Sequence, residues 1–102
     1  MKKDASDWQL YLIRCGDGSL YTGIAADIER RFAEHQSQGP KCAKYLRGRM
    51  PLELAFSISV EDRAQASRWE YLVKQLSKAD KESLVAGKKL LHELLESQSA
   101  EP

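Results

Sequence analysis

The chain has 102 residues, of which 42% are hydrophobic and 30% charged, and its net charge is +1 at pH 7. This length suits one domain with a modest core and excludes two domains. The apolar runs are only a few residues long, so the sequence predicts no transmembrane span and no signal peptide, and we expect a cytoplasmic protein. Because the net charge is close to zero, any binding of nucleic acid has to come from a local basic patch.

Two strands joined by a tight turn begin the predicted domain. Residues Gln9–Arg14 alternate only partly between polar and apolar types, which is typical of a central strand covered on both faces. Gly16-Asp17-Gly18 supplies residues that tolerate positive φ, as a hairpin turn requires. The second strand covers residues 19–24. Because strands of a hairpin lie side by side, we expect Tyr11 and Tyr21 to share one face of the sheet.

The first helix follows this hairpin, and a basic segment follows the helix. Asp27 is a good N-cap, and the helix is predicted to run to about Ser37. Arg31 and His35 stand four residues apart, so they lie on one face of this helix. The segment 41–49 then contains four cationic side chains and one tyrosine, and it has no acidic residue.

The second half of the chain is predicted to hold one strand and three helices. Residues 52–59 favour a strand, and residues 62–76 carry the apolar spacing of a long amphipathic helix. Ser77 caps a shorter helix that ends before Gly87. Residues 87–96 form the predicted C-terminal helix, whose leucine stripe is either core or a dimer surface, and we expect a monomer. The segments predicted to lie outside the folded part are a flexible N-terminus, residues 1–7, and a disordered tail, residues 97–102.

Four polar side chains in the first third of the chain fall at intervals that suit one site. Tyr11 and Tyr21 come from the two hairpin strands, and Arg31 and His35 come from the helix that follows. Taken alone, each tyrosine is also compatible with a strand residue that packs against its neighbours. Two phenols, a guanidinium and an imidazole that converge on one cleft indicate chemistry on a phosphate.

These residues resemble the motifs of the GIY-YIG nuclease family, in its small single-domain bacterial branch, the UPF0213 (YhbQ-like) proteins. The first half-motif stands here as Gln9-Leu10-Tyr11 and the second as Tyr21-Thr22-Gly23. Arg31 follows Gly23 by eight residues, where the family has its catalytic arginine, and His35 matches the family's histidine one helical turn later. The sequence departs from the family in two ways: Gln9 replaces the glycine of the first half-motif, and the chain has no asparagine, which some members use.

The resemblance covers residues 8–85 and implies both a fold and a boundary. The implied fold class is α+β, a small GIY-YIG domain with a three-stranded antiparallel sheet flanked by helices in the order β-β-α-β-α-α. This domain would occupy residues 8–86. Gly23 is expected to be a structural motif residue that leaves room for the close approach of a helix or a phosphate.

The resemblance also implies a role for each site residue. Glu70, on the long helix, would bind one divalent metal ion, Mg²⁺ or Mn²⁺, although a glutamate paired with a lysine one turn later has the same spacing. Tyr11 would be the general base, and its phenol needs Arg31, a lysine or the metal to lower its pKa from about 10. Tyr21 would orient the attacking water or bind the phosphate, and Arg31 would clamp the phosphate. His35 would accept a proton from Tyr11 or donate one to the phosphate.

The implied function is that of a metal-dependent endonuclease that hydrolyses DNA phosphodiester bonds with little base specificity. Its expected substrate is single-stranded or branched DNA, in preference to RNA, during repair or processing, with no membrane partner and no small-molecule cofactor. The alternatives are a GIY-YIG-fold protein that binds nucleic acid without efficient cleavage, and a plain interaction domain. The basic segment supplies the candidate nucleic-acid contacts, which are Lys41, Lys44, Tyr45, Arg47 and Arg49.

Overall fold

The sheet is the centre of the structure, a computed structural model that describes residues 7–99. The three strands are β1 (Gln9–Arg14), β2 (Leu20–Ala25) and β3 (Glu53–Ser59). They are antiparallel and lie in the order β2-β1-β3, so the first strand is the central one. The predicted α+β class with a three-stranded antiparallel sheet is confirmed.

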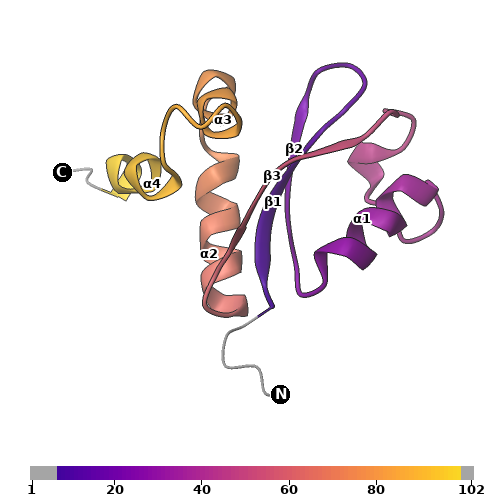
Figure 1. Ribbon diagram of the computed structural model, residues 1–102, viewed down its shortest axis with the longest axis horizontal. Helices are drawn as coiled ribbons and strands as arrows, with labels where there is room; N and C mark the ends of the chain where they lie inside the picture. Colours follow the sequence, from indigo (N-terminus) through magenta and orange to yellow (C-terminus); the bar gives the residue numbers. More distant parts are fainter. Residues whose placement is uncertain (1–6, 100–102) are drawn as a thin grey trace.

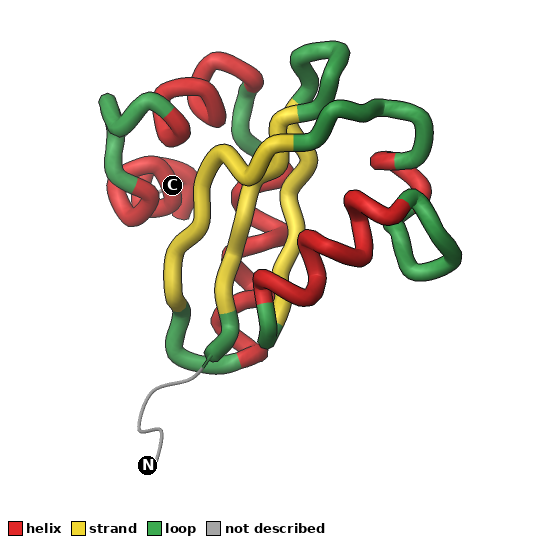
Figure 2. Tube along the Cα trace, turned by 45° about the vertical axis from the view of Figure 1, so that its right-hand side comes forward, coloured by secondary structure: helices red, strands yellow, loops and turns green. Residues whose placement is uncertain are grey.

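Helices cover the two faces of this sheet unequally (Figure 1, Figure 2). One face carries α1 and the other carries α2, with α3 and α4 beyond it. The helices are α1 (Ile28–Ser37), α2 (Arg63–Lys74), α3 (Lys78–Val85) and α4 (Leu91–Ser99), and a short 3₁₀ helix, η1 (Lys44–Leu46), lies between α1 and β3. Side chains of Asp27, Asp62 and Ser77 accept hydrogen bonds from backbone N–H groups and cap α1, α2 and α3.

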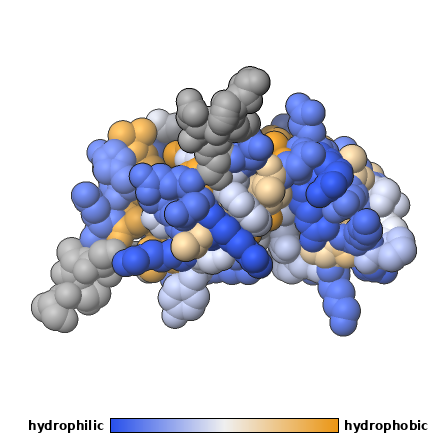
Figure 3. Space-filling view, turned by 90° about the horizontal axis from the view of Figure 1, so that it is seen from below, coloured by the Kyte–Doolittle hydropathy of each residue, from blue (hydrophilic) through white to orange (hydrophobic). Residues whose placement is uncertain are grey.

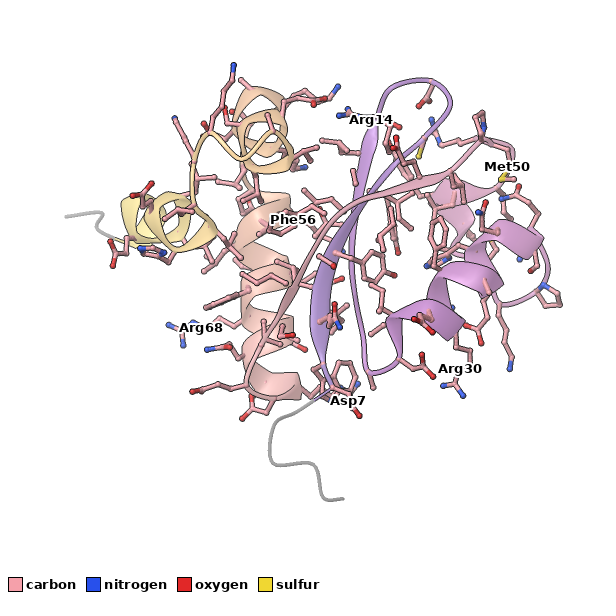
Figure 4. All side chains as sticks on the ribbon, viewed as in Figure 1. Asp7, Arg14, Arg30, Met50, Phe56 and Arg68 are labelled. Carbon is pink, nitrogen blue, oxygen red and sulfur yellow. The ribbon has the colours of Figure 1, made fainter. Side chains whose placement is uncertain are left out.

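Strand β1 divides the core into two clusters because its successive side chains point to opposite faces. Leu10 and Leu12 are fully buried on the face covered by α2. Tyr11 and Ile13 are buried on the face covered by α1. The prediction of a central strand covered on both faces is therefore confirmed. Figure 4 shows Phe56 between β3 and α2.

The connection after α1 is fixed by Gln38, which has a left-handed backbone (φ 59°) although it is not glycine. Its side-chain Nε2 donates to the carbonyl oxygen of Leu46 at 3.1 Å, and its Oε1 accepts from the N–H of Gly48 at 2.8 Å. These two hydrogen bonds offset the cost of the left-handed conformation, which is about 1 kcal/mol for a residue with a side chain. The basic segment 41–49 is thus held in a defined path against the sheet.

The structure differs from the sequence prediction at the edges of several elements. The basic segment 41–49, to which we assigned no helix or strand, contains η1. Helix α4 spans Leu91–Ser99 and not 87–96, so residues 97–99, which we assigned to a disordered tail, continue the helix. The predicted flexible N-terminus was 1–7 and the predicted tail was 97–102. Of these segments, residues 1–6 and 100–102 lie outside the described residues.

The surface opposite the β1–β2 turn is mostly hydrophilic, and its hydrophobic area is broken into small patches (Figure 3). Within residues 7–99, no helix is both long enough and apolar enough to cross a membrane.

Candidate active site

Tyr11 and Tyr21 lie side by side on the sheet face that α1 covers. In the antiparallel register, Tyr11 pairs with Gly23 and Tyr21 pairs with Ile13, so the two tyrosines project from the same face of β1 and β2. Their ring centroids are 6.5 Å apart. The arrangement expected from the hairpin is therefore present.

Gly23 makes room for the ring of Tyr11. A Cβ atom at position 23 would stand 2.5 Å from both Cζ and Oη of Tyr11, well inside van der Waals contact. We expected the glycine to admit a helix or a phosphate, and the structure shows that it admits the tyrosine of the other half-motif.

His35 is fully buried and connects α1 to Tyr11. Its Nε2 lies 3.0 Å from Oη of Tyr11, and the backbone N–H of Ala43 donates to its Nδ1 at 3.3 Å. Burial, followed by the positive charge of Arg31, lowers the pKa of His35 to about 4, so the ring is neutral at pH 7. Because Nδ1 accepts a hydrogen bond, the neutral ring carries its proton on Nε2 and donates to the oxygen of Tyr11. This geometry favours a donor role for His35 over a role as acceptor of the Tyr11 proton.

The lowered pKa of His35 predicts that the protein loses stability in mild acid. An unfolded chain titrates this histidine near pH 6.5 and the folded chain near pH 4, so the unfolded state binds more protons between these values. The His35 contribution to the free energy of unfolding should therefore fall by up to about 3 kcal/mol as the pH drops through this window. Urea unfolding between pH 7 and pH 4 measures it, and the His35→Gln variant should show a flatter dependence. His92→Gln, at an exposed histidine, is the control. Equal pH dependence in wild type and His35→Gln would contradict the assignment.

Arg31 lies one helical turn before His35 and is held beside the phenols. Its Nη1 donates to Oε1 of Glu34 at 2.9 Å and to the carbonyl oxygen of Lys41 at 2.7 Å. Burial and the neighbouring Tyr21 raise the pKa of Tyr11 to about 12, although the charge of Arg31 acts in the opposite direction. We expected Arg31, a lysine or a metal to lower this pKa. In the free protein burial outweighs Arg31, because the Tyr11 side chain is almost completely removed from water.

The basic segment reaches the site through Tyr45. The Tyr45 ring stacks on Tyr21 with centroids 5.7 Å apart, and the guanidinium carbon of Arg49 lies 4.2 Å from the centroid of Tyr45. Arg49 also forms an ion pair with Asp17 in the β1–β2 turn. Tyr45 therefore extends the row of aromatic rings that begins at Tyr11 and Tyr21, and Arg49 lies over the last ring.

The other three predicted contacts do not touch the tyrosines. Lys41 and Lys44 are exposed, and Lys41 contributes its carbonyl oxygen to Arg31. Arg47 donates from Nη2 to the carbonyl oxygen of Gly39 at 2.9 Å.

Glu70 approaches the site from the other layer of the molecule. It lies on α2, which packs against β2 and β1, and its Oε2 is 3.4 Å from Nζ of Lys74. Its negative charge is among the smaller influences that raise the pKa of Tyr11 and Tyr21, after burial. The structure thus brings four of the five candidate residues into one cluster, with Glu70 near them and paired with a lysine. Within residues 7–99, no three His, Cys, Asp or Glu side chains gather as a metal-binding group.

Sequence reasoning missed three groups that shape this site. Gln38 holds the basic segment, Asp17 pairs with Arg49, and the backbone of Ala43 orients His35. A polar residue directly before Gly39-Pro40 was the one available signal for Gln38, whereas nothing in the sequence marks Ala43.

A three-stranded sheet with paired tyrosines, an arginine and a histidine on the following helix defines the GIY-YIG class, and the comparisons agree. The model of the GIY-YIG catalytic domain matches residues 7–83, so the chain belongs to the GIY-YIG family.

Within this family the chain is similar to UPF0213 proteins. It is 57% identical over 90 residues to the UPF0213 protein YhbQ of Escherichia coli O1:K1, which covers 88% of each chain. It is 51% identical over 96 residues to a UPF0213 protein of Cronobacter sakazakii, covering 94% of this chain and 98% of that one. The solution NMR structure of the UPF0213 protein BH0048 from Bacillus halodurans superposes with a TM-score of 0.51 at 42% identity, over 85% of this chain and 90% of the other.

Proposed function

We propose that the protein is an endonuclease that hydrolyses DNA phosphodiester bonds with little base specificity and depends on one divalent metal ion. The observation that carries this proposal is the cluster in which His35 donates to Tyr11, with Tyr21 and Arg31 beside them. Single-stranded or branched DNA is the proposed substrate because its unpaired bases can stack on the exposed ring of Tyr45.

Each residue of the cluster has a role in this proposal. Arg31 clamps the scissile phosphate with parallel N–H donors. Tyr11 in its phenolate form is the general base that takes a proton from the attacking water, and the Nε2–H of His35 stabilises the negative charge of this phenolate. Tyr21 orients the attacking water, and Tyr45 with Arg49 supports the neighbouring nucleotide.

A hydrated divalent ion fits the single carboxylate at Glu70. Mg²⁺ usually keeps several waters and takes one or two carboxylates, and Glu70 is half-buried beside a flexible lysine, so its oxygens can exchange partners. When bound, the ion would neutralise phosphate charge and stabilise the leaving oxygen.

The replacement of glycine by Gln9 does not count against activity. Gln9 lies in regular strand β1 opposite Ala25, and it is not among the described residues with positive φ. A side chain is therefore tolerated at this position without backbone strain.

The proposal is tested by cleavage of end-labelled oligonucleotides: single-stranded, duplex and branched DNA, and RNA of the same sequence. Each is incubated with Mg²⁺, Mn²⁺ or chelator. We expect metal-dependent cleavage of single-stranded or branched DNA. Binding without cleavage in the presence of each metal would contradict the nuclease assignment and favour a protein that binds nucleic acid without cleaving it.

A Glu70→Gln variant should lose on the order of 100-fold in cleavage rate, because the carboxylate that holds the ion is gone. The affinity for oligonucleotides in chelator should stay at the wild-type level or rise, since a negative charge beside Lys74 is removed. Binding of Mn²⁺ alone, followed by calorimetry, provides a readout that does not depend on activity. Glu96→Gln, at an exposed position on α4, is the matched control. Unchanged Mn²⁺ binding and cleavage in Glu70→Gln would remove Glu70 from the site.

A further inference from the structure

Helix α2 meets α3 on the sheet face opposite to α1 (Figure 1), and the sequence places three lysines at and just after this junction. Lys74 is the last residue of α2, Lys78 is the first residue of α3, and Lys81 lies one turn further. Nζ of Lys78 donates to the carbonyl oxygen of Gly18 at 3.2 Å, which joins this corner to the β1–β2 turn. Lys74 contacts Glu70, so the cluster begins at the candidate metal ligand.

Lys74 and Lys78 each lie beside a carboxylate, but Glu82 is shared with Arg14 and Lys81 lacks such a partner among the described residues. Glu82 lies 3.4 Å from Lys78, but it already accepts hydrogen bonds from both terminal nitrogens of Arg14, one of them at 2.7 Å. Figure 4 shows Arg14 at the end of β1 near α3. No carboxylate of residues 7–99 lies within 4.0 Å of Lys81.

Lys81 is also close enough to Lys74 and Lys78 for their charges to change its pKa. Partial burial, and then the positive charges of Lys74 and Lys78, lower its pKa below the ordinary value. Like charges that the fold holds together repel one another, and a bound anion removes that cost.

Both basic clusters are attached to the same turn. Asp17 pairs with Arg49 of the basic segment, and the carbonyl oxygen of Gly18 binds Lys78. A phosphodiester chain that crosses the site between Arg31 and Glu70 can therefore reach Arg49 and Lys78, which are both attached to this turn. Successive phosphates in such a chain are suited to this arrangement because each brings one negative charge.

We propose that Lys74, Lys78 and Lys81, the lysine surface, form a second contact for the sugar–phosphate backbone of the nucleic acid that the candidate active site cleaves. This inference rests on the proposed function for the identity of its ligand. In this proposal the lysine surface contacts the part of the strand that leaves the site past Glu70. The segment 41–49 contacts the part of the strand on the other side of the site.

The test is the salt dependence of binding, measured by fluorescence anisotropy with a labelled single-stranded DNA oligonucleotide in chelator. In the Lys74→Gln/Lys78→Gln/Lys81→Gln variant, the slope of log K against log salt should decrease in magnitude by about 2, since each lost phosphate contact removes about 0.7. Affinity at low salt should fall at least about tenfold. The control Arg63→Gln/Arg68→Gln/Lys88→Gln removes the same charge at exposed positions that form no ion pair with a carboxylate of residues 7–99, and it should keep the wild-type slope.

Three outcomes would overturn the lysine surface: a wild-type slope in the first triple variant, an equal loss in the control, or no binding by the wild type. Circular dichroism checks that each variant folds. The single variant Lys81→Glu reverses a charge without breaking an ion pair, so it should weaken binding even if the triple variant does not fold. Failure of the nuclease proposal is a separate result, namely binding by the wild type without cleavage.

Discussion

A Tyr11→Phe variant is expected to lose about 10²- to 10⁴-fold in cleavage rate while it binds oligonucleotides as tightly as the wild type. The substitution removes the proposed base and keeps the ring that packs against Gly23 and Tyr21. Single-turnover cleavage and anisotropy measure the two quantities. Tyr71→Phe removes a hydroxyl from an exposed tyrosine and is the matched control.

The pH dependence of the wild type provides a second readout for Tyr11. Because its pKa is about 12 in the free protein, the phenolate fraction increases about tenfold for each pH unit between 7 and 10. The logarithm of the single-turnover rate should therefore rise with a slope near one across this range. A flat profile, or wild-type cleavage by Tyr11→Phe, would assign the base to another group.

A Gly23→Ala variant should destabilise the protein by about 2 kcal/mol and reduce cleavage strongly, because the added methyl group forces the Tyr11 ring out of place. Without that contact, alanine in place of glycine in a strand would be neutral or stabilising. Urea unfolding measures the free energy, and the sign of the change separates the two cases.

The same substitution in two other backgrounds isolates the contact. In Tyr11→Leu the atoms Cζ and Oη are absent, so Gly23→Ala should cost little or increase stability. In Tyr11→Phe the ring carbon Cζ remains, so the cost should persist. An equal cost in all three backgrounds would show that the methyl group clashes with something other than Tyr11.

Local signals in the sequence predicted much of this fold. The predicted caps Asp27 and Ser77 determine where α1 and α3 start through contacts within a few residues, and Asp62, given only as the approximate start of the long helix, caps α2 in the same way. The side-by-side arrangement of the tyrosines follows from the two-residue period of hairpin strands. The limits of α4 were predicted less well, because a leucine pattern marks a helical face and does not mark its ends, and Leu90 is exposed just before the helix.

The finer geometry of the site depends on contacts between distant segments, which sequence spacing does not encode. The proton position on His35 depends on Ala43, and the stacking of Tyr45 on Tyr21 depends on the path from Gln38 to Arg49. The raised pKa of Tyr11 likewise reflects burial in the cluster between the sheet and α1. Residue types indicated which groups take part, and tertiary packing determines how they are protonated and paired.

Asp17 is an internal counterion for Arg49 of the basic segment. Hydrogen bonds from Ser19, together with the pairing with Arg49, lower the pKa of Asp17 to about 2, so its charge is present at any physiological pH. A phosphate that takes the Nη1 donor of Arg49 has to displace a carboxylate that the fold keeps within reach at a high effective concentration. Polyanions that touch the surface loosely therefore gain less from this arginine than a strand that exchanges with Asp17.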